Sequence, residues 1–325
     1  MATFKSMRLY AACALLTGAA AAHNALAQNY PSETVRVIVP FGPGGGSDLA
    51  ARMVAKELSE AFRQPFVIEN RPGAGALVGA KALVDAAPDG HTLMISTSSW
   101  LSSAALVSKP TFNPLTDVIP IVTFGYNVFV LAVHPSLPVK TTRDLITLAR
   151  SKPGDLAYGH SGTGSITHLS MALLLNMAKV DMLAVPYKSG GAVMPDVMSG
   201  RTQVILSGLV NVVPHAKSGK LRLLGISVAQ RSKLLPDVPP LADAVPGYNV
   251  ASWFGAVAPK GTPQTIIALL NSTINKLTQK QEFRKNADAL GFIITGSTTD
   301  EIAKLVRSDY ARWKKLAQDA NIKIN

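Results

Sequence analysis

The segment VRVIVPFGPGGGSDLAARMVAKEL, residues 35–58, decides the fold class of this 325-residue chain. It opens with β-branched apolar residues, which predict a buried strand, and Pro40 ends the ladder because it has no N–H. A loop rich in glycine and proline follows, and apolar residues then recur at helical spacing. We expect Ser47 to cap this helix and Asp48 to favour its positive end. The bare loop and helix N-terminus would attract an anion, although a tight turn without a ligand explains the same pattern.

The same organisation returns in the second half of the chain. Residues 156–158 read as a strand, residues 159–165 as a loop of glycine, serine and threonine, and residues 166–179 as a helix. Strand and helix patterns also alternate over residues 66–96, and such alternation predicts a parallel α/β sheet. Because ligands of such sheets bind at the carboxyl ends of strands, we expect the two glycine-rich loops to lie at the site.

The first 27 residues have the pattern of a signal peptide. Lys5 and Arg8 form a positive region, residues 9–22 are apolar, and small residues precede a cleavage site after Ala27. Cys13, the only cysteine, lies in this leader, so the predicted mature chain has no disulfide and no cysteine ligand for a metal. We therefore expect an exported protein, and its length favours two lobes.

The chain is strongly basic, with a formal net charge of +12. A basic surface attracts small anions or anionic lipid, although a solvated basic surface is the simpler explanation. The basic residues are scattered rather than clustered, and together with the export signal this disfavours nucleic acid. No apolar run after the leader reaches the length that a membrane-spanning helix needs.

Two loops of the chain resemble known functional motifs, but neither matches its motif in full. The first loop resembles a dinucleotide fingerprint, but Ser47 stands in place of its third glycine, and no P-loop sequence is present. Residues 159–163 resemble the hydrolase elbow, but Thr163 replaces its final glycine. Ser161 is either a nucleophile or, as we favour, a hydrogen-bond donor to a ligand or a helix cap. No histidine or carboxylate pair has the spacing of a metal site, so we expect no cofactor and no metal.

Seven segments in order over the mature chain resemble the Bug family, the extracytoplasmic solute receptors of tripartite tricarboxylate transporters. They are YPSETVRVIVPFGPGGGSDLAAR, FVIENRPGAGALVGA, APDGHTLMIS, SGTGSITHLS, VPYKSGGAVMPDVMSGRTQVILSGL, GKLRLLGISVAQRS and WFGAVAPKGTP. The resemblance implies an α/β periplasmic-binding-protein fold of two lobes, type II-like, with two hinge crossover segments. We expect residues 28–125 and 248–325 to form lobe 1 and residues 126–247 to form lobe 2.

The resemblance also implies a function that is not catalytic. Such a receptor holds a small organic acid between its lobes, mostly through backbone N–H groups and hydroxyls, and delivers it to the membrane subunits of the transporter. We expect a monomer, and we keep an exported serine hydrolase that uses Ser161 as the alternative. The predicted ligand-binding residues are Phe41, Gly44, Gly45, Gly46, Ser47, Asp48, Thr97, Ser98, Ser161, Gly162, Thr163, Gly164, Ser165, Thr167, His168, Tyr187, Lys188, Ser189, Gly190 and Asn211.

Two of these residues have competing interpretations. His168 lies one turn into its helix, where it faces the cleft or supports a neighbouring element. Lys188 stands beside a glycine pair, where it binds an anion or is simply solvated. The side chains that would recognise the far end of the ligand include Thr97, Tyr126 and Asn211, and one sequence does not reveal which acid they select.

Overall fold

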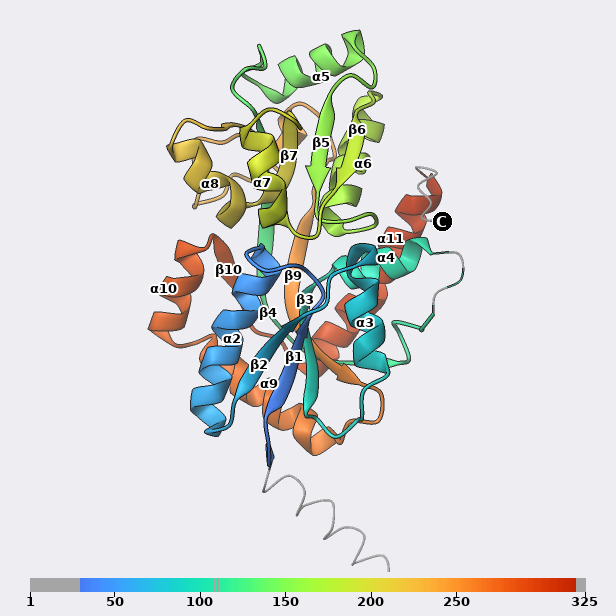
Figure 1. Cartoon of the computed structure of the whole chain (residues 1–325), viewed down its shortest axis with the longest axis vertical. Helices are drawn as coiled ribbons and strands as arrows, with labels where there is room; N and C mark the ends of the chain where they lie inside the picture. The colour runs from blue at the N-terminus through green and yellow to red at the C-terminus, as the bar shows by residue number, and fades with distance from the viewer. Residues whose placement is uncertain (1–29, 108, 110, 320–325) are drawn as a thin grey trace, which may run out of the picture.

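A computed structural model describes residues 30–107, 109 and 111–319 and shows two α/β lobes stacked along the long axis (Figure 1). The long strand β4 (Val118–Val133) runs through both lobes. It pairs antiparallel with β9 (Ala251–Pro259) as far as Val128, and from Phe129 onward it pairs with β7 (Val204–Gly208). The sheet is therefore continuous, with the strand order β2-β1-β3-β9-β4-β7-β5-β6 and with β8 and β10 also paired to β4.

Lobe 1, the lower lobe in Figure 1, has the decisive segment at its centre. Strand β1 (Val35–Val39) pairs parallel with β2 (Phe66–Asn70) and with β3 (Thr92–Thr97). Its apolar residues are fully buried, as expected for a parallel strand with helices over both faces. The other elements of this lobe are α2 (Gly46–Phe62), η1 (Ala74–Ala76), α3 (Leu77–Val84), α4 (Ser99–Leu106), α9 (Gln264–Leu277), α10 (Gln281–Ala289), β10 (Phe292–Ile294) and α11 (Thr299–Asp319).

Lobe 2, the upper lobe, repeats this arrangement on a smaller scale. Strand β5 (Ala157–His160) pairs parallel with β6 (Leu183–Pro186) and with β7. The short β5 leads directly into the second glycine-rich loop, as β1 leads into the first. The other elements are α5 (Thr142–Ser151), α6 (Ile166–Ala178), α7 (Gly190–Met198), α8 (Leu209–Lys217), β8 (Arg222–Ile226) and η2 (Leu241–Asp243).

The last helix, α11, connects the cores of the two lobes. Ile302 and Val306 in its first half pack into a lobe 1 cluster with Trp253. Trp313 and Ala317 in its second half belong to the main core cluster of lobe 2. Since a buried Trp contributes a large apolar area, α11 is a third link between the lobes beside the two crossings of the chain at β4 and β9.

The structure confirms the two-lobe α/β fold and corrects several local predictions. The polar residues 97–100 are predicted from the sequence to be an exit from a strand, but α4 begins at Ser99. The sequence pattern predicts a short helix over residues 212–217, whereas α8 begins at Leu209. Strand β10 is not predicted, because a three-residue strand carries too short a pattern. The predicted lobe boundary at residues 125 and 126 falls within β4, and the exact limits of the lobes remain a prediction. The predicted signal peptide lies outside the described residues.

Candidate functional site

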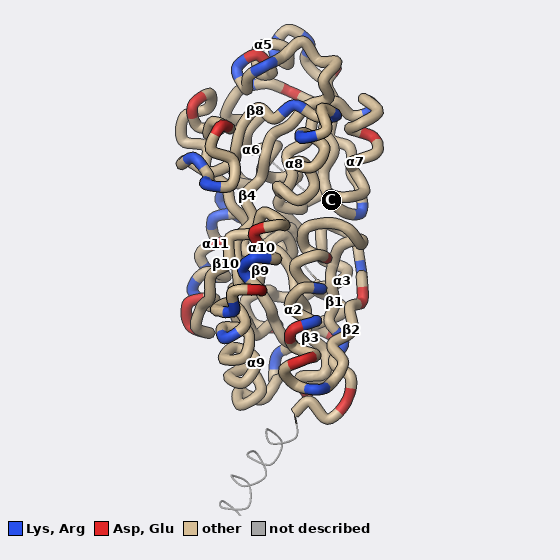
Figure 2. Tube along the Cα trace, turned by 90° about the vertical axis from the view of Figure 1, so that its left-hand side faces the viewer, with Lys and Arg blue, Asp and Glu red and all other residues tan. Residues whose placement is uncertain are grey.

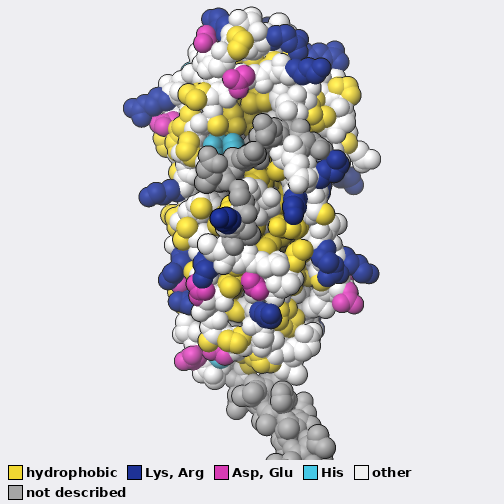
Figure 3. All heavy atoms as spheres, turned by 90° about the vertical axis from the view of Figure 1, so that its right-hand side faces the viewer, with side chains coloured by type: hydrophobic (Ala, Val, Ile, Leu, Met, Phe, Trp, Pro, Cys, Tyr) yellow, Lys and Arg dark blue, Asp and Glu magenta, His cyan; other side chains and the backbone are white. Residues whose placement is uncertain are grey.

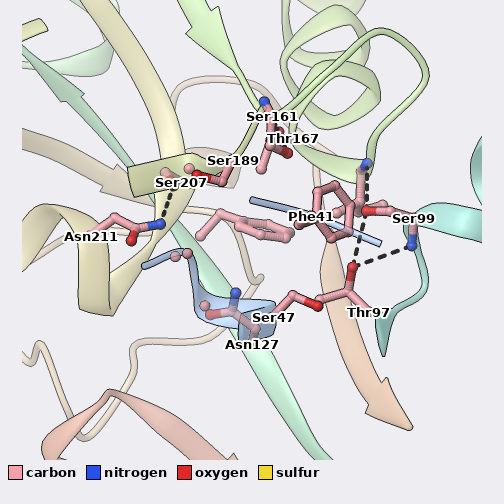
Figure 4. A pocket seen from close by; sticks show the side chains of 16 residues that line it. Phe41, Ser47, Thr97, Ser99, Asn127, Ser161, Thr167, Ser189, Ser207 and Asn211 are labelled. Carbon is pink, nitrogen blue, oxygen red and sulfur yellow. Dashed lines mark hydrogen bonds between the residues drawn. The ribbon is translucent and has the colours of Figure 1, made fainter. Parts of the chain in front are cut away.

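A small cavity of about 40 Å³ lies between the lobes (Figure 4). This volume has room for a few water molecules. Hydroxyl, amide and backbone groups line it together with two phenyl rings, and no charged side chain of the described residues does so. The lining residues are Phe41, Gly45, Gly46, Ser47, Thr97, Ser99, Asn127, Phe129, Ser161, Ile166, Thr167, Ser189, Gly190, Ser207, Gly208 and Asn211.

Five helices begin at this cavity. Gly46, Ser99, Ile166 and Gly190 are the first residues of α2, α4, α6 and α7, and Gly208 is the N-cap of α8. The first N–H groups of a helix have no partner within it, and the helix dipole places partial positive charge at this end. The cavity therefore favours a negative charge without a cationic side chain.

The loop between β1 and α2 leads into a helix N-terminus that has no side-chain cap. Gly45, with φ −84° and ψ 166°, is the N-cap of α2 and gives no side-chain cap, so the prediction that Ser47 caps this helix is wrong. The helix begins at Gly46, two residues earlier than a Ser47 cap implies, and Ser47 lies inside its first turn. The Ser47 side chain lines the cavity and is buried, yet its Oγ has no hydrogen-bond partner in the described part of the chain. A buried hydroxyl without a partner is costly, so this atom is available to a ligand.

Asp48 stabilises the same loop through hydrogen bonds and does not line the cavity. Its carboxylate accepts hydrogen bonds from Gly44 N at 3.0 Å, Asn70 Nδ2 at 2.8 Å and Arg52 Nε at 2.9 Å. Burial acts to raise the pKa of Asp48, but these hydrogen bonds and the Arg52 charge outweigh it and hold the pKa below its usual value. Asn70 Nδ2 also donates to Phe41 O at 2.9 Å. Asp48 is therefore a positioning residue for the loop.

The loop between β5 and α6 uses its hydroxyl groups within lobe 2. Ser165 caps α6, since its Oγ accepts a hydrogen bond from His168 N at 3.3 Å. Ser161 Oγ lies 2.8 Å from Thr167 Oγ1, and Thr167 Oγ1 also accepts from Ser161 N at 3.1 Å. This second glycine-rich loop is thus largely satisfied without a ligand.

Two stacked imidazoles support this second loop. The ring centroids of His160 and His168 are 4.4 Å apart, and Gly164 N donates to His168 Nδ1 at 3.1 Å. Burial lowers the pKa of both rings, and the nearby His168 lowers the pKa of His160 further, to about 4. Both rings are therefore neutral at pH 7 and provide no charge to an anion.

The starts of α7 and α8 and the strand β4 form the third wall. A Cβ at Gly190 would collide with Asn211 Nδ2, so any other residue at this position would displace the Asn211 side chain. Asn211 Nδ2 donates to Ser207 Oγ at 3.0 Å. Asn127 on β4 is buried, and its Oδ1 has no partner among the residues that the structure describes. Two amide side chains thus lie at this wall, and the Oδ1 of Asn127 is free to accept a hydrogen bond.

Direct hydrogen bonds join the lobes around the cavity. Gly42 N of lobe 1 donates to Lys188 O of lobe 2 at 2.9 Å. In the opposite direction, Ile166 N at the start of α6 donates to Ser99 Oγ of lobe 1 at 3.1 Å. The structure is therefore a closed form, in which a ligand in the cavity is enclosed by both lobes.

The structure brings half of the predicted site residues to the cavity, namely Phe41, Gly45, Gly46, Ser47, Thr97, Ser161, Thr167, Ser189, Gly190 and Asn211. The other half surround the cavity without lining it, namely Gly44, Asp48, Ser98, Gly162, Thr163, Gly164, Ser165, His168, Tyr187 and Lys188. Some of these have other partners: Ser98 Oγ lies 2.8 Å from Ser252 Oγ, and Tyr187 OH donates to Asp196 Oδ2 at 2.7 Å. Lys188 is exposed. Contact of either set with a ligand remains a prediction.

Six lining residues were missed from the sequence. Ser207 and Gly208 are the last residues of β7, and Ser99 and Ile166 adjoin predicted site residues. Asn127 and Phe129 alternate on β4, so strand periodicity could have found them once the residues facing the cleft were known.

The geometry does not support catalysis by Ser161. Its Oγ pairs with Thr167 Oγ1 at 2.8 Å, and His168 Nδ1 already accepts from Gly164 N. No cluster of three or more side chains suited to a metal occurs in the described ranges. Within those same ranges, no helix is both long and apolar enough to cross a membrane. Lys and Arg side chains are spread over both lobes on the face that Figure 3 shows, without a single continuous stripe.

Comparison with known proteins places this geometry in a family. The sequence model of the family described as "Tripartite tricarboxylate transporter family receptor" matches residues 50–322. Protein BugT of Bordetella pertussis is 32% identical over 301 residues, which are 92% of each chain. A protein from the tcbD-tcbE intergenic region of Pseudomonas sp. (strain P51) is 30% identical and covers 91% of this chain and 89% of its own.

Solved structures agree with the sequence comparison. The R. palustris protein Rpa4515 with adipate is 34% identical, has a TM-score of 0.87 and covers 90% of this chain and 99% of its own. MatC from Rhodopseudomonas palustris with bound malate is 31% identical and has a TM-score of 0.84. The match covers 88% of this chain and 99% of MatC. The matched family is described as a transporter receptor rather than an enzyme, so the serine hydrolase alternative is wrong. The chain belongs to the receptor family of the tripartite tricarboxylate transporters.

Proposed function

We propose that this receptor captures a small carboxylate in the cavity between its lobes. One observation carries the proposal: the N-termini of five helices converge on a cavity whose lining, among the described residues, has no charged side chain. The partnerless Ser47 Oγ adds a donor at the same place. An anion there gains charge-assisted hydrogen bonds and needs no buried cation.

The choice of a carboxylate is supported by the two relatives that carry adipate and malate. We place one carboxylate group at the first turn of α2, near Gly46 and Ser47. The Asn127 side chain lies beside this turn, with its Nδ2 3.6 Å from where a Cβ of Gly46 would be, whereas Asn211 belongs to α8 in lobe 2. Both amide side chains line the cavity, where they would meet the rest of the molecule. Ordered water completes the contacts at little cost in entropy.

The receptor would work in the periplasm with a membrane partner. In this proposal, the leader is removed after Ala27 and the monomeric receptor delivers its ligand to the membrane subunits of a tripartite tricarboxylate transporter. Lobe 1 would move relative to lobe 2 by bending at β4 and β9. In this proposal lobe 1 consists of residues 28–125 and 248–325, and lobe 2 of residues 126–247. Closure around the ligand would produce the form that those subunits recognise.

A thermal-shift screen tests the ligand class. We expect at least one member of a panel of mono-, di- and tricarboxylates that includes adipate and malate to raise the melting temperature, because a ligand that binds only the folded state stabilises it. Neutral matched compounds, such as adipamide for adipate, should have no effect. Stabilisation by a neutral sugar or amide with none by any carboxylate would reject the proposal.

Uptake of the labelled ligand separates transport from a purely sensory role. A strain without this receptor should lose uptake, and the plasmid-borne wild-type receptor should restore it. Normal uptake in the deletion strain, in spite of tight binding by the purified protein, would reject the transport partner and leave the ligand class intact.

A further inference from the structure

A second and much larger cavity, about 730 Å³, lies at the junction of the lobes. Figure 2 looks onto this side of the molecule, where the labels of β4, β10 and α10 lie at the waist. We call it the hinge groove, and its lining includes Tyr126, Val128, Arg231, Lys233, Arg284 and Ile293. Its volume falls within the usual range of about 300–1,000 Å³ for small-molecule sites.

The hinge groove and the cleft cavity lie on opposite faces of the same strand. Asn127 and Phe129 of β4 line the cleft cavity, whereas Tyr126 and Val128 line the hinge groove. Successive side chains of a strand point to opposite faces, which explains the division. Ala251, the partner of Val128 on β9, also lines the groove.

The two walls of the groove belong to different lobes. Arg231 and Lys233 come from the segment after β8 in lobe 2, whereas Arg284 and Ile293 come from α10 and β10 in lobe 1. Rotation about strands that separate two cavities narrows one cavity as it widens the other. Closing the cleft would therefore move the groove walls apart, so the groove would be wider in this closed structure than in an open one.

The groove is apolar within and basic at its rim. Val128 and Ile294 contribute apolar surface, and Ile293 is 44% exposed although it is a large aliphatic residue. Exposed apolar surface rimmed by polar groups is typical of a binding site. The rim carries the three cations Arg231, Lys233 and Arg284 but only one acid, Asp288.

The three rim cations keep their charge available. Arg231 donates to the backbone oxygen of Pro236 at 2.9 Å, and Arg284 donates to the neutral amide of Gln279 at 3.4 Å. Across residues 30–107, 109 and 111–319, no ion pair engages any of the three. The surface therefore suits a ligand with an apolar body and an anionic head.

We propose that the hinge groove is a second binding site, that it takes a small amphipathic anion, and that its occupation favours the closed form. A molecule that touches both walls in the wide form resists reopening of the cleft. Because coupling between sites is reciprocal, groove occupation would also raise affinity in the cleft. The site is separate from the proposed carboxylate cavity, so it can be tested without knowing the cleft ligand.

The first test titrates the full-length mature protein with 8-anilinonaphthalene-1-sulfonate, an amphipathic anion that fluoresces in apolar surroundings. Ile293→Asp and Arg284→Glu each place a negative charge in the groove and should weaken binding of the probe by about tenfold. The matched controls are Leu183→Asp, another exposed aliphatic residue on a strand, and Lys285→Glu, the next residue on α10, which does not line the groove. Neither control should change the affinity.

Two results would overturn the second site. Probe affinity unchanged in both groove variants would show that the probe binds elsewhere, and so would an equal loss in the control variants. Circular dichroism and thermal unfolding of each variant identify a folding defect. If Ile293→Asp fails to fold, Arg284→Glu, which changes an exposed side chain, decides the result.

The second test concerns coupling to closure. A side chain at Gly191 would meet Gly44 and Gly45 of the opposite lobe, so Gly191→Leu should hold the cleft open. We expect this variant to bind the probe about tenfold more weakly, because the groove narrows as the cleft opens. Ala192→Leu, at the adjacent exposed position, is the control. Equal probe affinity in Gly191→Leu and the wild type would overturn the coupling.

Discussion

The two glycine-rich loops look alike in sequence but differ in what they leave free. The loop before α2 has no side-chain cap, and Ser47 Oγ has no partner in the described structure. In the loop before α6, Ser165 caps the helix, and the Ser161 hydroxyl forms a hydrogen bond with the Thr167 hydroxyl. Both loops follow a parallel strand and precede a helix, so the difference lies in their side chains rather than in the fold.

This difference suggests a division of labour between the lobes. Free donors can form new bonds to an anion, whereas donors that are already bonded must first give up a partner. Lobe 1 would therefore form most of the hydrogen bonds to the ligand. The loop of lobe 2 would mainly cover the ligand with a preformed surface. Asp48 supports the first role by fixing the uncapped loop through Gly44 and Asn70.

The largest effect is expected from Gly45→Val. The backbone of Gly45 is extended and accepts Val, but a Cβ there would lie 3.3 Å from Ser189 Cβ of the opposite lobe. We expect calorimetry to show a loss of ligand affinity of about 100-fold, because closure is obstructed. The melting temperature of the ligand-free protein should be nearly unchanged. Wild-type affinity would show that the first loop does not need to approach lobe 2.

Asp48→Asn should reveal the cost of loosening the first loop. The substitution weakens the bonds to Gly44 and Arg52, so we expect the free energy of unfolding to fall by about 2 kcal/mol. Chemical denaturation measures it. Lys56→Gln, which removes only the exposed pair of Lys56 with Glu60, should cost less than about 0.5 kcal/mol. Equal losses in the two variants would contradict the positioning role of Asp48.

The second loop should be the more sensitive of the two to acid. The pKa of His160 is lowered to about 4 and that of His168 is also lowered, so the unfolded state binds protons that the folded state does not. The contribution of the two neutral imidazoles to the free energy of unfolding is therefore full above about pH 6.5 and is lost as the pH falls toward 4. We expect His160 alone to lower the free energy of unfolding by about 2 kcal/mol between pH 7 and pH 5. Unfolding curves over this range measure the loss.

The matched variant for this pH dependence is His160→Gln. It should lose most of the acid dependence and keep the smaller contribution of His168. An unchanged pH profile in His160→Gln would exclude the buried imidazole as the cause.

The smallest effects come from a pair of serine substitutions with opposite outcomes. Ser47→Ala should lower ligand affinity by about tenfold and leave stability unchanged, because it removes a hydroxyl that has no partner without a ligand. Ser165→Ala should lower stability by about 1 kcal/mol through loss of the helix cap and should change affinity less. Calorimetry and denaturation of both variants would decide, and the reverse pattern would contradict the proposed division between the loops.

The sequence predicted the features that depend on local pattern. Strand, loop and helix periodicity predicted the α/β organisation, and half of the site residues that the family resemblance implied line the cavity. Side-chain roles were harder to predict. Serine is one of the residues that N-caps favour, but the N-cap of α2 is Gly45 rather than Ser47. The local sequence pattern fits a cap at either residue.

Other features depended on contacts between distant segments. Asn127 faces the cavity because β4 passes between the lobes, and Ser99 of lobe 1 contacts the start of α6 in lobe 2 across the cleft. The hinge groove joins segments more than 150 residues apart, from Tyr126 to Ile293. Such juxtapositions follow from the tertiary fold and leave little periodic signal in one sequence.

The most direct test of the account is a crystal structure of the receptor with the tightest-binding carboxylate from the screen. The account predicts that one carboxylate group lies at the first turn of α2, with its oxygens about 2.7–3.2 Å from Gly46 N, Ser47 N or Ser47 Oγ. A carboxylate bound instead by the loop of lobe 2, with Ser47 Oγ still without a partner, would contradict it.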